Sequence, residues 1–423
     1  MSKNIQIIAI ILSICIGCSS EPEINIKASI GKYNLANEIN AKIVEEHFFQ
    51  DKAMKNINPR LGKALIKQLD SQKIYFTKNE ILYFTNKFQS SADDVEIATS
   101  YELINLYFNR LIEATKYQIK VIQKKDFDFS KVENILIDNN LQEFRETNLD
   151  LREIWVKLAK NDVLTSMLTD KTADEAVELI SKRYKNRLRR ISQRNEEDIF
   201  SIVMNNLTGL FDPHSSYMSP KSAEDFEMTM SLNLEGIGAL LTTEDDYPII
   251  VSVVPGGPAE KSGKINPDDK IVKVRQIKQA EVDSVDVVGW RIDEVVQLIR
   301  GEAGTQLELE IIPAKTEDLS DRKWVLLTRE EVKLEEQAAK FLIVDAPQGE
   351  RSFKIGIIDL PAFYIDFNAW RDRDPDFRSS SKDVEDILNK FKLANVDAVI
   401  VDLRGNSGGS LYEANKLTGL FVS

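Results

Sequence analysis

The residues best suited to chemistry form a glycine-rich turn near the end of the chain. Residues 405–409 read Gly-Asn-Ser-Gly-Gly and follow the apolar run Val396 to Leu403. That Val- and Ile-rich run has the composition of a strand buried on both faces, and Ser410 is expected to cap the helix that comes next. A strand, a glycine turn and a helix N-terminus aim free backbone N–H groups at one point. Such an arrangement makes an anion or oxyanion site.

A second glycine pair offers backbone chemistry of another kind. Residues 235–239 read Glu-Gly-Ile-Gly-Ala and stand just before the expected strand Leu240 to Thr242. Glycines here let successive N–H groups turn inward and hold a carboxylate, which is how a peptide C-terminus is captured by backbone. The sequence therefore predicts a carboxylate-binding loop.

Helices dominate the part of the chain before this loop. Apolar residues recur at helical spacing over 104–122 and again over 177–191, where Thr172 with Glu175 forms a capping box. The outer face of the second helix is basic: Lys182, Arg183, Lys185, Arg187, Arg189, Arg190 and Arg194. This face can be interpreted as a polyanion patch or as a solvated basic face on an acidic protein, and composition favours the second.

A proline-containing turn ends the helical region. It runs from Phe211 to Pro220, where Asp-Pro and Ser-Pro dipeptides mark turns. His214 stands beside Asp212 and Ser215, but members of a catalytic triad come together in space rather than in sequence. We interpret His214 as a structural residue of a linker.

Short strands and then a strand–helix–strand unit make up the rest. Strands are expected near 240–242, 249–254, 270–274 and 307–312, with a short helix over 292–299. Lys354 to Leu360, Lys382 to Lys392 and Val396 to Leu403 then predict a βαβ unit with a right-handed crossover. The predicted fold class is multidomain α+β: a helical N-terminal domain, a β-rich domain and the start of an α/β core.

Composition narrows the function classes. The 423 residues are enough for two or three domains, and 43% hydrophobic with 29% charged residues is ordinary for a globular protein. A net charge of −13 argues against a nucleic-acid partner, and two His with two Cys leave little for a metal site. We expect no metal, no cofactor and no nucleic acid.

The first twenty residues, Met1 to Ser20, have the pattern of a targeting segment. Lys3 precedes the apolar stretch Ile5 to Ile16, and Gly17-Cys18 resembles a bacterial lipoprotein processing site with Cys18 as the lipidated residue. Cys15 departs from that pattern, so a simple cleaved signal peptide is the main alternative. Cys15 and Cys18 also form a C-x-x-C pattern, but the βαβ unit that a redox motif needs is absent here. Either targeting interpretation predicts export, and lipidation adds a membrane tether.

Three linked motifs carry a resemblance to PDZ domains. In order they are Gly236-Ile237-Gly238-Ala239, Pro255-Gly256-Gly257-Pro258-Ala259 and Asp268-Asp269-Lys270-Ile271-Val272. The resemblance implies that a peptide adds as a strand and that its carboxylate meets the N–H groups of Ile237, Gly238 and Ala239. The residues that would then wall the side-chain pocket are Val295, Val296 and Ile299.

A wider resemblance covers residues 30 to 423. The helical part, Asp212-Pro213-His214, the PDZ-like segment and Asp402-Leu403-Arg404 with Asn406 and Gly408-Gly409 are ordered as in the C-terminal-processing, or tail-specific, serine peptidases. The large periplasmic branch of that family is the most similar. The expected domains are 1–20 signal peptide, 24–227 helical, 228–315 PDZ-like and 323–423 an incomplete peptidase core.

That family implies an envelope serine endopeptidase with a Ser–Lys dyad, for which Gly408 and Gly409 match the glycines beside the oxyanion hole. Protein substrates with free C-terminal tails are its implied partners, with room for an adaptor lipoprotein. The family's nucleophile and lysine have no counterpart here. Lys416 lies six residues after Ser410, on nearly the opposite face of a helix, so these two cannot replace the dyad.

We therefore expect the chain to be part of a longer protease. The alternative is a non-catalytic, membrane-tethered adaptor that binds tails through its PDZ domain. The glycine turn favours the protease, because a pure tail binder has no evident use for it.

Overall fold

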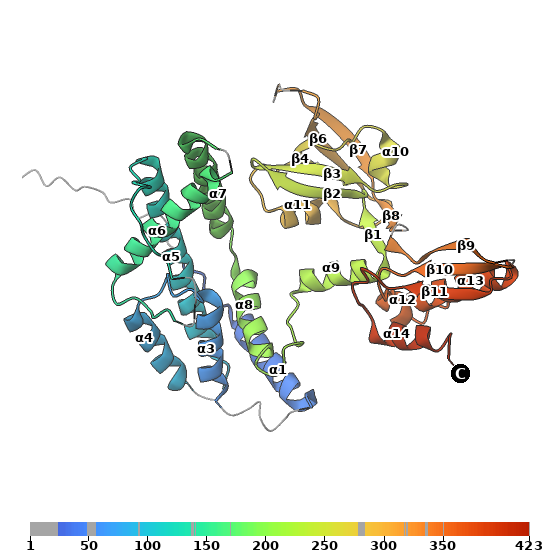
Figure 1. Ribbon diagram of the computed structural model, residues 1–423, viewed down its shortest axis with the longest axis horizontal. Coiled ribbons are helices and arrows are strands. Elements are labelled where there is room, and N and C mark those ends of the chain that lie inside the picture. The colour runs from blue at the N-terminus through green and yellow to red at the C-terminus, as the bar shows by residue number, and fades with distance from the viewer. Residues whose placement is uncertain are drawn as a thin grey trace, which may run out of the picture. The chain divides into compact units, whose positions relative to one another are not determined.

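The computed structural model describes residues 24–422, except for 49–55, 92–93, 137–138, 140, 170, 278–283, 317, 319, 335–336 and 350. The expected signal segment and Cys18 lie outside the described residues. The chain divides into two compact units, residues 1–219 and 220–423. Figure 1 shows helices throughout the first unit and mixed helices and strands in the second.

Amphipathic helices build the first unit. They are α1 (Ile30–Glu46), α3 (Ile57–Leu69), α4 (Lys78–Gln89), α5 (Ile97–Gln123), α6 (Asn148–Met167), α7 (Ala173–Ser192) and α8 (Glu196–Thr208). The capping box predicted before α7 is present: Thr172 accepts from the Glu175 N–H and Glu175 accepts from the Thr172 N–H.

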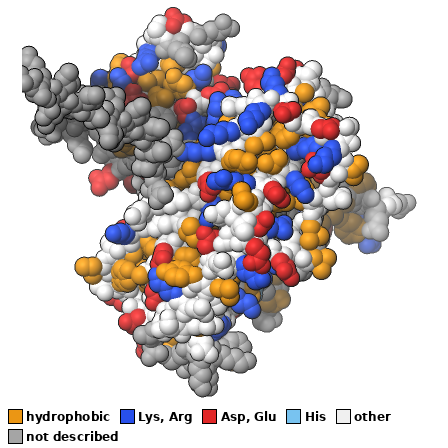
Figure 2. All heavy atoms as spheres, turned by 90° about the vertical axis from the view of Figure 1, so that its left-hand side faces the viewer, with side chains coloured by type: hydrophobic (Ala, Val, Ile, Leu, Met, Phe, Trp, Pro, Cys, Tyr) orange, Lys and Arg blue, Asp and Glu red, His pale blue; other side chains and the backbone are white. Residues whose placement is uncertain are grey.

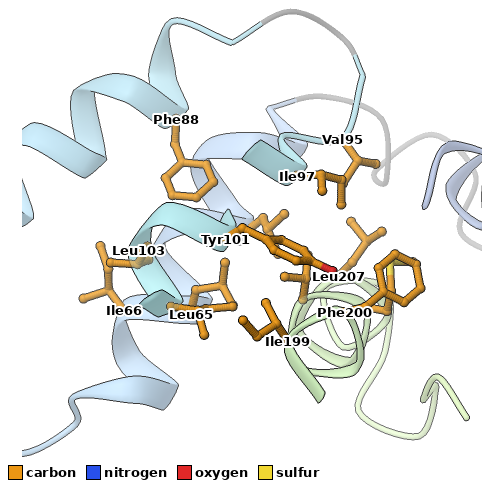
Figure 3. Packing of buried hydrophobic residues seen from close by; sticks show 14 of the residues in the cluster. Leu65, Ile66, Phe88, Val95, Ile97, Tyr101, Leu103, Ile199, Phe200 and Leu207 are labelled. Atoms are coloured by element: carbon orange, nitrogen blue, oxygen red, sulfur yellow. The ribbon is translucent and has the colours of Figure 1, made fainter. Parts of the chain in front are cut away.

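The long helix α5 supplies much of the core of this unit. Its expected apolar stripe is confirmed, because Ile104, Phe108 and Ile122 are buried. Figure 3 shows side chains of α3, α5 and α8 pointing toward one another, with Leu65 and Phe200 from the two flanking helices. Apolar burial of this kind is the main source of stability for helices of ordinary length.

The second unit begins with α9 (Pro220–Ser231), and its described residues form three sheets (Figure 1). Its remaining helices are α10 (Pro258–Ser262), α11 (Ile292–Ile299), α12 (Phe367–Arg371), α13 (Ser380–Leu393) and α14 (Leu411–Thr418). Its strands are β1 (Asn233–Gly236), β2 (Ala239–Glu244), β3 (Tyr247–Val253), β4 (Lys270–Ile277), β5 (Ser284–Asp286), β6 (Gln306–Ile312), β7 (Lys323–Thr328), β8 (Glu330–Lys333), β9 (Lys340–Gln348), β10 (Arg351–Asp359) and β11 (Ala398–Asp402).

The largest sheet is antiparallel and runs β2-β3-β4-β6-β7, with β5 paired to β4. A tight hairpin joins β2 to β3, and Asp245 and Asp246 have φ of 43° and 74°, as a two-residue turn of mirror type requires. The sheet extends beyond residue 315, the expected end of the PDZ-like segment, because β7 pairs with β6. Its core includes Ile250 and Leu309, both fully buried.

The predicted βαβ unit is present near the end of the chain. Strands β10 and β11 are parallel, with Ile357 opposite Ile400, and α13 connects them. Strand β9, for which the sequence analysis assigned no element, pairs antiparallel with β10. The ring of Phe391 on α13 packs against Gly356 on β10, where an added Cβ would lie 2.3 Å from a ring atom.

The expectation that Val396 to Leu403 is buried on both faces is wrong. Val399 and Ile400 are 38% and 49% exposed. The reason is the position of β11 at the edge of a three-stranded sheet whose middle strand, β10, carries the α13 contact. Apolar composition alone does not distinguish a central strand from an edge strand.

Candidate functional site

The outer edge of β2 is the first candidate site. Strand β2 is the last strand on its side of the sheet, and no described strand pairs with that edge. Leu240 on this strand is 58% exposed, and α11 lies against β2. An unpaired strand edge beside a helix can accept an extended peptide as an additional strand.

Backbone hydrogen bonds fix the loop before β2. The Ala259 N–H donates to the Ile237 carbonyl and the Val254 N–H donates to the Gly238 carbonyl, each at 2.8 Å. Because a trans peptide is planar, its N–H points opposite to its carbonyl. The N–H groups of Gly238 and Ala239 therefore point away from residues 254–259, on the side where an anion could bind.

Glycine at position 238 is required by this geometry. Gly238 has φ of +69°, and a Cβ there would lie 3.2 Å from the Gly257 Cα. The neighbouring Ile237 is buried in the core of the sheet, 2% exposed, and so holds the loop in place. Backbone conformation and burial together keep two successive N–H groups on one side.

The expected pocket residues lie on α11. Val295 and Ile299 are buried in the same core as Ile237, whereas Val296 is half-buried. Val296 is therefore the one of the three with surface left for a ligand side chain. The other two support the wall from behind.

The glycine turn after β11 is the second candidate site. It is held to the segment after β10 by backbone hydrogen bonds: the Phe363 N–H donates to the Gly408 carbonyl and the Ser410 N–H donates to the Phe363 carbonyl, both at 2.8 Å. Asn406 adds a side-chain link, because its Nδ2 donates to the Leu360 carbonyl at 2.8 Å. The turn is therefore a fixed part of the sheet edge.

The two glycines expected beside the oxyanion hole have different partners. The Gly408 N–H donates to Asn406 Oδ1 at 2.8 Å. The Gly409 N–H shares a peptide plane with the Gly408 carbonyl and points away from Phe363. Among the described residues it has no acceptor, so Gly409 offers the free donor and Gly408 helps to position it.

Ser410, Ser407 and Lys416 occupy structural positions around this turn. Ser410 caps α14, as expected, by accepting from the Glu413 N–H. The Ser407 Oγ lies 3.4 Å from the Pro361 carbonyl, and the Lys416 Nζ lies over the ring of Phe377, 5.9 Å from its centroid. Their contacts give no sign of a serine–lysine pair.

Glu413 is a residue of this site that the sequence analysis missed. It is fully buried, and its Oε2 accepts from the Ser381 N–H at 2.7 Å and from the Ser380 Oγ at 3.2 Å. These donors belong to the first turn of α13, where a carboxylate is favoured by the helix dipole. Glu413 therefore ties α14 to α13. Its place three residues after Ser410 would instead have suggested a capping box.

Asp402 and Arg404 form an ion pair where β11 ends. The Arg404 guanidinium donates to Asp402, Nη2 to Oδ2 at 2.6 Å, and the Arg404 backbone N–H donates to Oδ1 at 3.0 Å. These hydrogen bonds lower the pKa of Asp402 to about 2. The aspartate stays charged and holds the backbone where the turn begins.

His214 has the linker position that was expected. Its side chain is 93% exposed, and its backbone N–H donates to Asp212. Asp212 also accepts from Ser215 and lies 3.2 Å from His47 Nε2, and the hydrogen bond from Ser215 is the main cause of its lowered pKa. These contacts join α1 to the turn after α8.

An acidic cleft of about 750 Å³ lies within the second unit. Seven carboxylates and one guanidinium, that of Arg300, are among its lining side chains: Glu224, Glu227, Glu235, Glu302, Asp366, Asp372 and Asp374. Among the described residues, no group of His, Cys, Asp or Glu is placed to hold a metal ion. Within the same residues, no helix combines the length and the apolarity that crossing a membrane requires.

Three family models match the chain in succession. The tail-specific protease N-terminal domain matches residues 39–221, the PDZ domain matches residues 226–312 and peptidase family S41 matches residues 354–423. The free edge of β2 and its loop fall within the second match, and the glycine turn falls within the third.

The chain is also similar to individual proteins. The tail-specific protease of Haemophilus influenzae is 32% identical over 438 aligned residues, which cover 100% of this chain and 59% of that protein. The carboxy-terminal processing protease CtpA of Bacillus subtilis is 26% identical over 264 residues, 62% of this chain and 49% of that protein. A PDZ domain of the carboxy-terminal protease from Vibrio cholerae, solved with a peptide, is 44% identical, covers 24% of this chain and 99% of its own, and has a TM-score of 0.21.

The chain spans only part of its relatives: 59% of the Haemophilus protein and 49% of the Bacillus protein.

Proposed function

This chain belongs to the C-terminal-processing, or tail-specific, protease family, whose members combine a serine peptidase core with a PDZ domain, and we propose that it supplies the substrate-recognition part of such an enzyme. The proposed reaction is hydrolysis of peptide bonds in proteins selected by their free C-terminal tails. The observation that carries the proposal is the loop before β2, whose Gly238 and Ala239 N–H groups point outward beside an unpaired strand edge.

Tail recognition follows from that geometry. A substrate tail would add to β2 as an extended strand, with main-chain hydrogen bonds along the edge. Its terminal carboxylate would accept from the N–H groups of Gly238 and Ala239. Its last side chain would meet Val296 on α11, supported from behind by Val295 and Ile299.

Cleavage would use the second glycine turn. In a Ser–Lys mechanism a neutral lysine removes the proton of the serine hydroxyl, and the serine oxygen then attacks the peptide carbonyl. The negative charge that develops on the carbonyl oxygen needs a fixed donor. We assign that role to the Gly409 N–H, oriented by Gly408 and Asn406. No residue of the 423 is assigned as nucleophile or base, and we propose that both belong to the longer protein that the relatives represent.

Peptide binding tests the recognition step directly. A fluorescent peptide with a free C-terminus and an apolar last residue should bind the chain, and its C-terminal amide should bind more weakly by about 1.5–3 kcal/mol, the value of a hydrogen-bonded charged group. A Val296→Asp variant should bind the free-acid peptide more weakly than the wild type does. Leu298→Ala, on the same helix but outside the assigned pocket, is the control and should bind it as the wild type does. Equal affinity for acid and amide would remove the carboxylate loop from the proposal.

Cleavage is tested on the protein as its cells make it. Purified native protein should cleave a reporter that ends in the bound tail, and a Gly409→Ala variant should lose cleavage while it keeps tail binding. Tail binding by a native protein that never cleaves would favour the non-catalytic, tethered adaptor.

We also propose that the protein is located in the bacterial envelope and anchored through a lipid on Cys18. The support is the apolar stretch Ile5 to Ile16 followed by Gly17-Cys18. Metabolic labelling with a radioactive fatty acid should mark the wild-type protein and not a Cys18→Ser variant. Equal labelling of both would remove Cys18 as the anchor.

A further inference from the structure

A cationic pocket lies inside the helical unit, apart from both glycine turns. It has a volume of about 470 Å³ and is formed by residues of α3, α5, α7 and α8 with the segments that follow α3 and α7. Phe108, Leu111 and Ile191 give it apolar walls, and the guanidinium groups of Arg187, Arg190 and Arg194 give it positive charge. Its size lies in the range of small-ligand pockets.

Two of the three arginines of this pocket have no acidic partner among the described residues. No carboxylate is among the described residues that line it, although the whole chain carries a net charge of −13. Within the described part of the chain, neither Arg187 nor Arg190 has an ion pair or a side-chain hydrogen bond. Arg194 has only a long contact of 3.6 Å with Asp198. Arg187 is half-buried, whereas Arg190 and Arg194 are exposed, so the three guanidinium groups stand at the mouth of the pocket beside its apolar walls. Guanidinium groups in such a position can bind an anion that carries an apolar group.

Neighbouring aromatic rings place these charges. The Arg187 guanidinium lies over the ring of Tyr184, 4.9 Å from its centroid, and Arg194 lies 6.0 Å from the ring centroid of Phe108. Stacking on a ring face leaves the N–H edge of a guanidinium free to bind a carboxylate or a phosphate through two parallel hydrogen bonds. The two arginines are therefore already partly oriented.

Two tyrosines add neutral hydrogen-bond donors. The rings of Tyr75 and Tyr107 meet edge to face with centroids 5.4 Å apart, and both residues line the pocket. Burial raises the pKa of each hydroxyl above its ordinary value. Both hydroxyls therefore stay protonated at neutral pH and do not oppose an anion.

A solvated basic helix face would look different. Arg183 and Lys185 on α7 are exposed and do not line the pocket. Arg190 and Arg194 are exposed as well but line it, and Arg187 is half-buried. Figure 2 shows basic and acidic side chains interspersed over the face that it draws, so positive charge is not general there. The pocket combines positive charge with aromatic and aliphatic walls. A basic helix face that only interacts with water would not need such walls.

We propose that this pocket binds an amphiphilic anion, a phosphate or carboxylate that carries an alkyl or aryl group. The anionic group would accept from Arg187 and Arg190, and the apolar group would pack on Phe108, Leu111 and Ile191. Two sources fit this chemistry, an acidic lipid and a soluble organic anion.

Calorimetric titration of the 423-residue chain tests the pocket, with dodecyl phosphate below its micelle concentration as the probe. Dodecyl phosphate should bind with one site, whereas inorganic phosphate and uncharged dodecyl maltoside should each bind at least roughly tenfold more weakly. The double variant Arg187→Gln/Arg190→Gln should weaken dodecyl phosphate by roughly 10- to 100-fold, the loss expected for charged hydrogen bonds. The matched control Arg183→Gln, an exposed arginine of the same helix, should bind as the wild type does.

A second variant and a measurement of helix content test whether weaker binding is caused by unfolding. Leu111→Gln should weaken dodecyl phosphate while the arginines remain, and circular dichroism should show the helix content of the wild type for every variant. Unchanged affinity in the double arginine variant, or equal affinity for dodecyl phosphate and dodecyl maltoside, would overturn the proposal. Flotation with phosphatidylcholine vesicles that contain phosphatidic acid distinguishes the two sources. Vesicle binding that depends on Arg187 and Arg190 indicates an acidic lipid, whereas binding of dodecyl phosphate without vesicle binding indicates a soluble anion.

Discussion

The loop before β2 and the turn after β11 use the same device in different surroundings. In both, backbone carbonyls accept hydrogen bonds from a neighbouring segment, so the N–H of the same peptide plane points outward. The loop offers the N–H groups of Gly238 and Ala239. The turn offers that of Gly409.

The two sites differ in how they are supported. Burial of Ile237 in the core of the large sheet holds the loop, and a complete hydrophobic cluster lies beneath it. The turn has hydrogen bonds from side chains as well, those of Asn406 and the tie from Glu413 to α13, in addition to its backbone bonds with Phe363. Hydrophobic burial is non-directional, whereas hydrogen bonds fix position and angle.

This difference fits the two proposed roles. A tail carboxylate binds in the ground state and tolerates small shifts of its donors. An oxyanion exists only during reaction, and its donor must be in place before the charge appears. We therefore expect the turn after β11 to be the more sensitive of the two to small changes.

The largest expected effect is that of Gly409→Ala. A Cβ at this position would lie 2.4 Å from the Phe363 carbonyl oxygen, and φ is +138°. The turn must move, and opening of residues 398–418 should become easier by roughly 3 kcal/mol or more. Native-state hydrogen exchange with mass spectrometry measures that opening energy.

Gly405→Ala is the matched control. Gly405 also has a positive φ, +77°, but nothing lies within 4 Å of an added Cβ. It should therefore show only the backbone cost of about 1 kcal/mol. Equal effects of the two substitutions would mean that the Phe363 contact does not hold the turn.

Asn406→Ala should have the next largest effect. The substitution removes two hydrogen bonds, one to the Leu360 carbonyl and one from the Gly408 N–H, each 2.8 Å long. The expected loss is about 2 kcal/mol in the same exchange measurement. Asn406→Asp keeps the acceptor for Gly408 and loses the donor, so it should fall between the alanine variant and the wild type.

Gly238→Ala separates the two sites most clearly. Its φ of +69° and the 3.2 Å approach to Gly257 predict a stability loss of about 1 kcal/mol, smaller than that for Gly409. Binding of a free-acid peptide should fall while exchange of residues 398–418 stays unchanged. Gly256→Ala, with φ of +76° and an open Cβ position, is the control and should leave peptide affinity unchanged. A loss of affinity in both variants would mean that strain in the loop, rather than displacement of the Gly238 and Ala239 N–H groups, weakens peptide binding.

Local patterns in the sequence predicted much of this architecture. The Thr172 and Glu175 capping box, the stripe of α5 and the β10–α13–β11 unit each depend on neighbouring residues or on one periodicity. The helix cap at Ser410 was found in the same way. Where a structure is determined by adjacent residues, pattern is enough.

Long-range contacts explain what was missed. Nothing local shows that β9 pairs with β10 or that β11 is an exposed edge, because both depend on which strands assemble into the sheet. Likewise, the sequence pattern predicts Gly408 and Gly409 as one pair beside the oxyanion hole and does not distinguish their N–H groups. Only the contacts of Phe363 and Asn406 reveal that the Gly408 N–H is occupied and that of Gly409 is free.

The smallest effect is expected at the ion pair that begins the turn. Arg404 is 91% exposed, so its removal should barely change stability. It should instead move the pKa of Asp402, now lowered to about 2 by the Arg404 hydrogen bonds, upward toward the ordinary aspartate value. Because the folded pKa is the lower one, the contribution of Asp402 to stability is complete above the unfolded pKa and disappears as pH falls through about 2.

In Arg404→Gln that loss should begin at higher pH. Carbon-detected NMR titration of the Asp402 carboxyl reports the shift directly, and Asp397, an acid of the same strand region with its own backbone donor at Lys354, is the internal control. An unmoved Asp402 pKa would mean that the backbone N–H of residue 404 lowers it without the guanidinium. The start of the turn would then be held by its backbone hydrogen bond rather than by the ion pair.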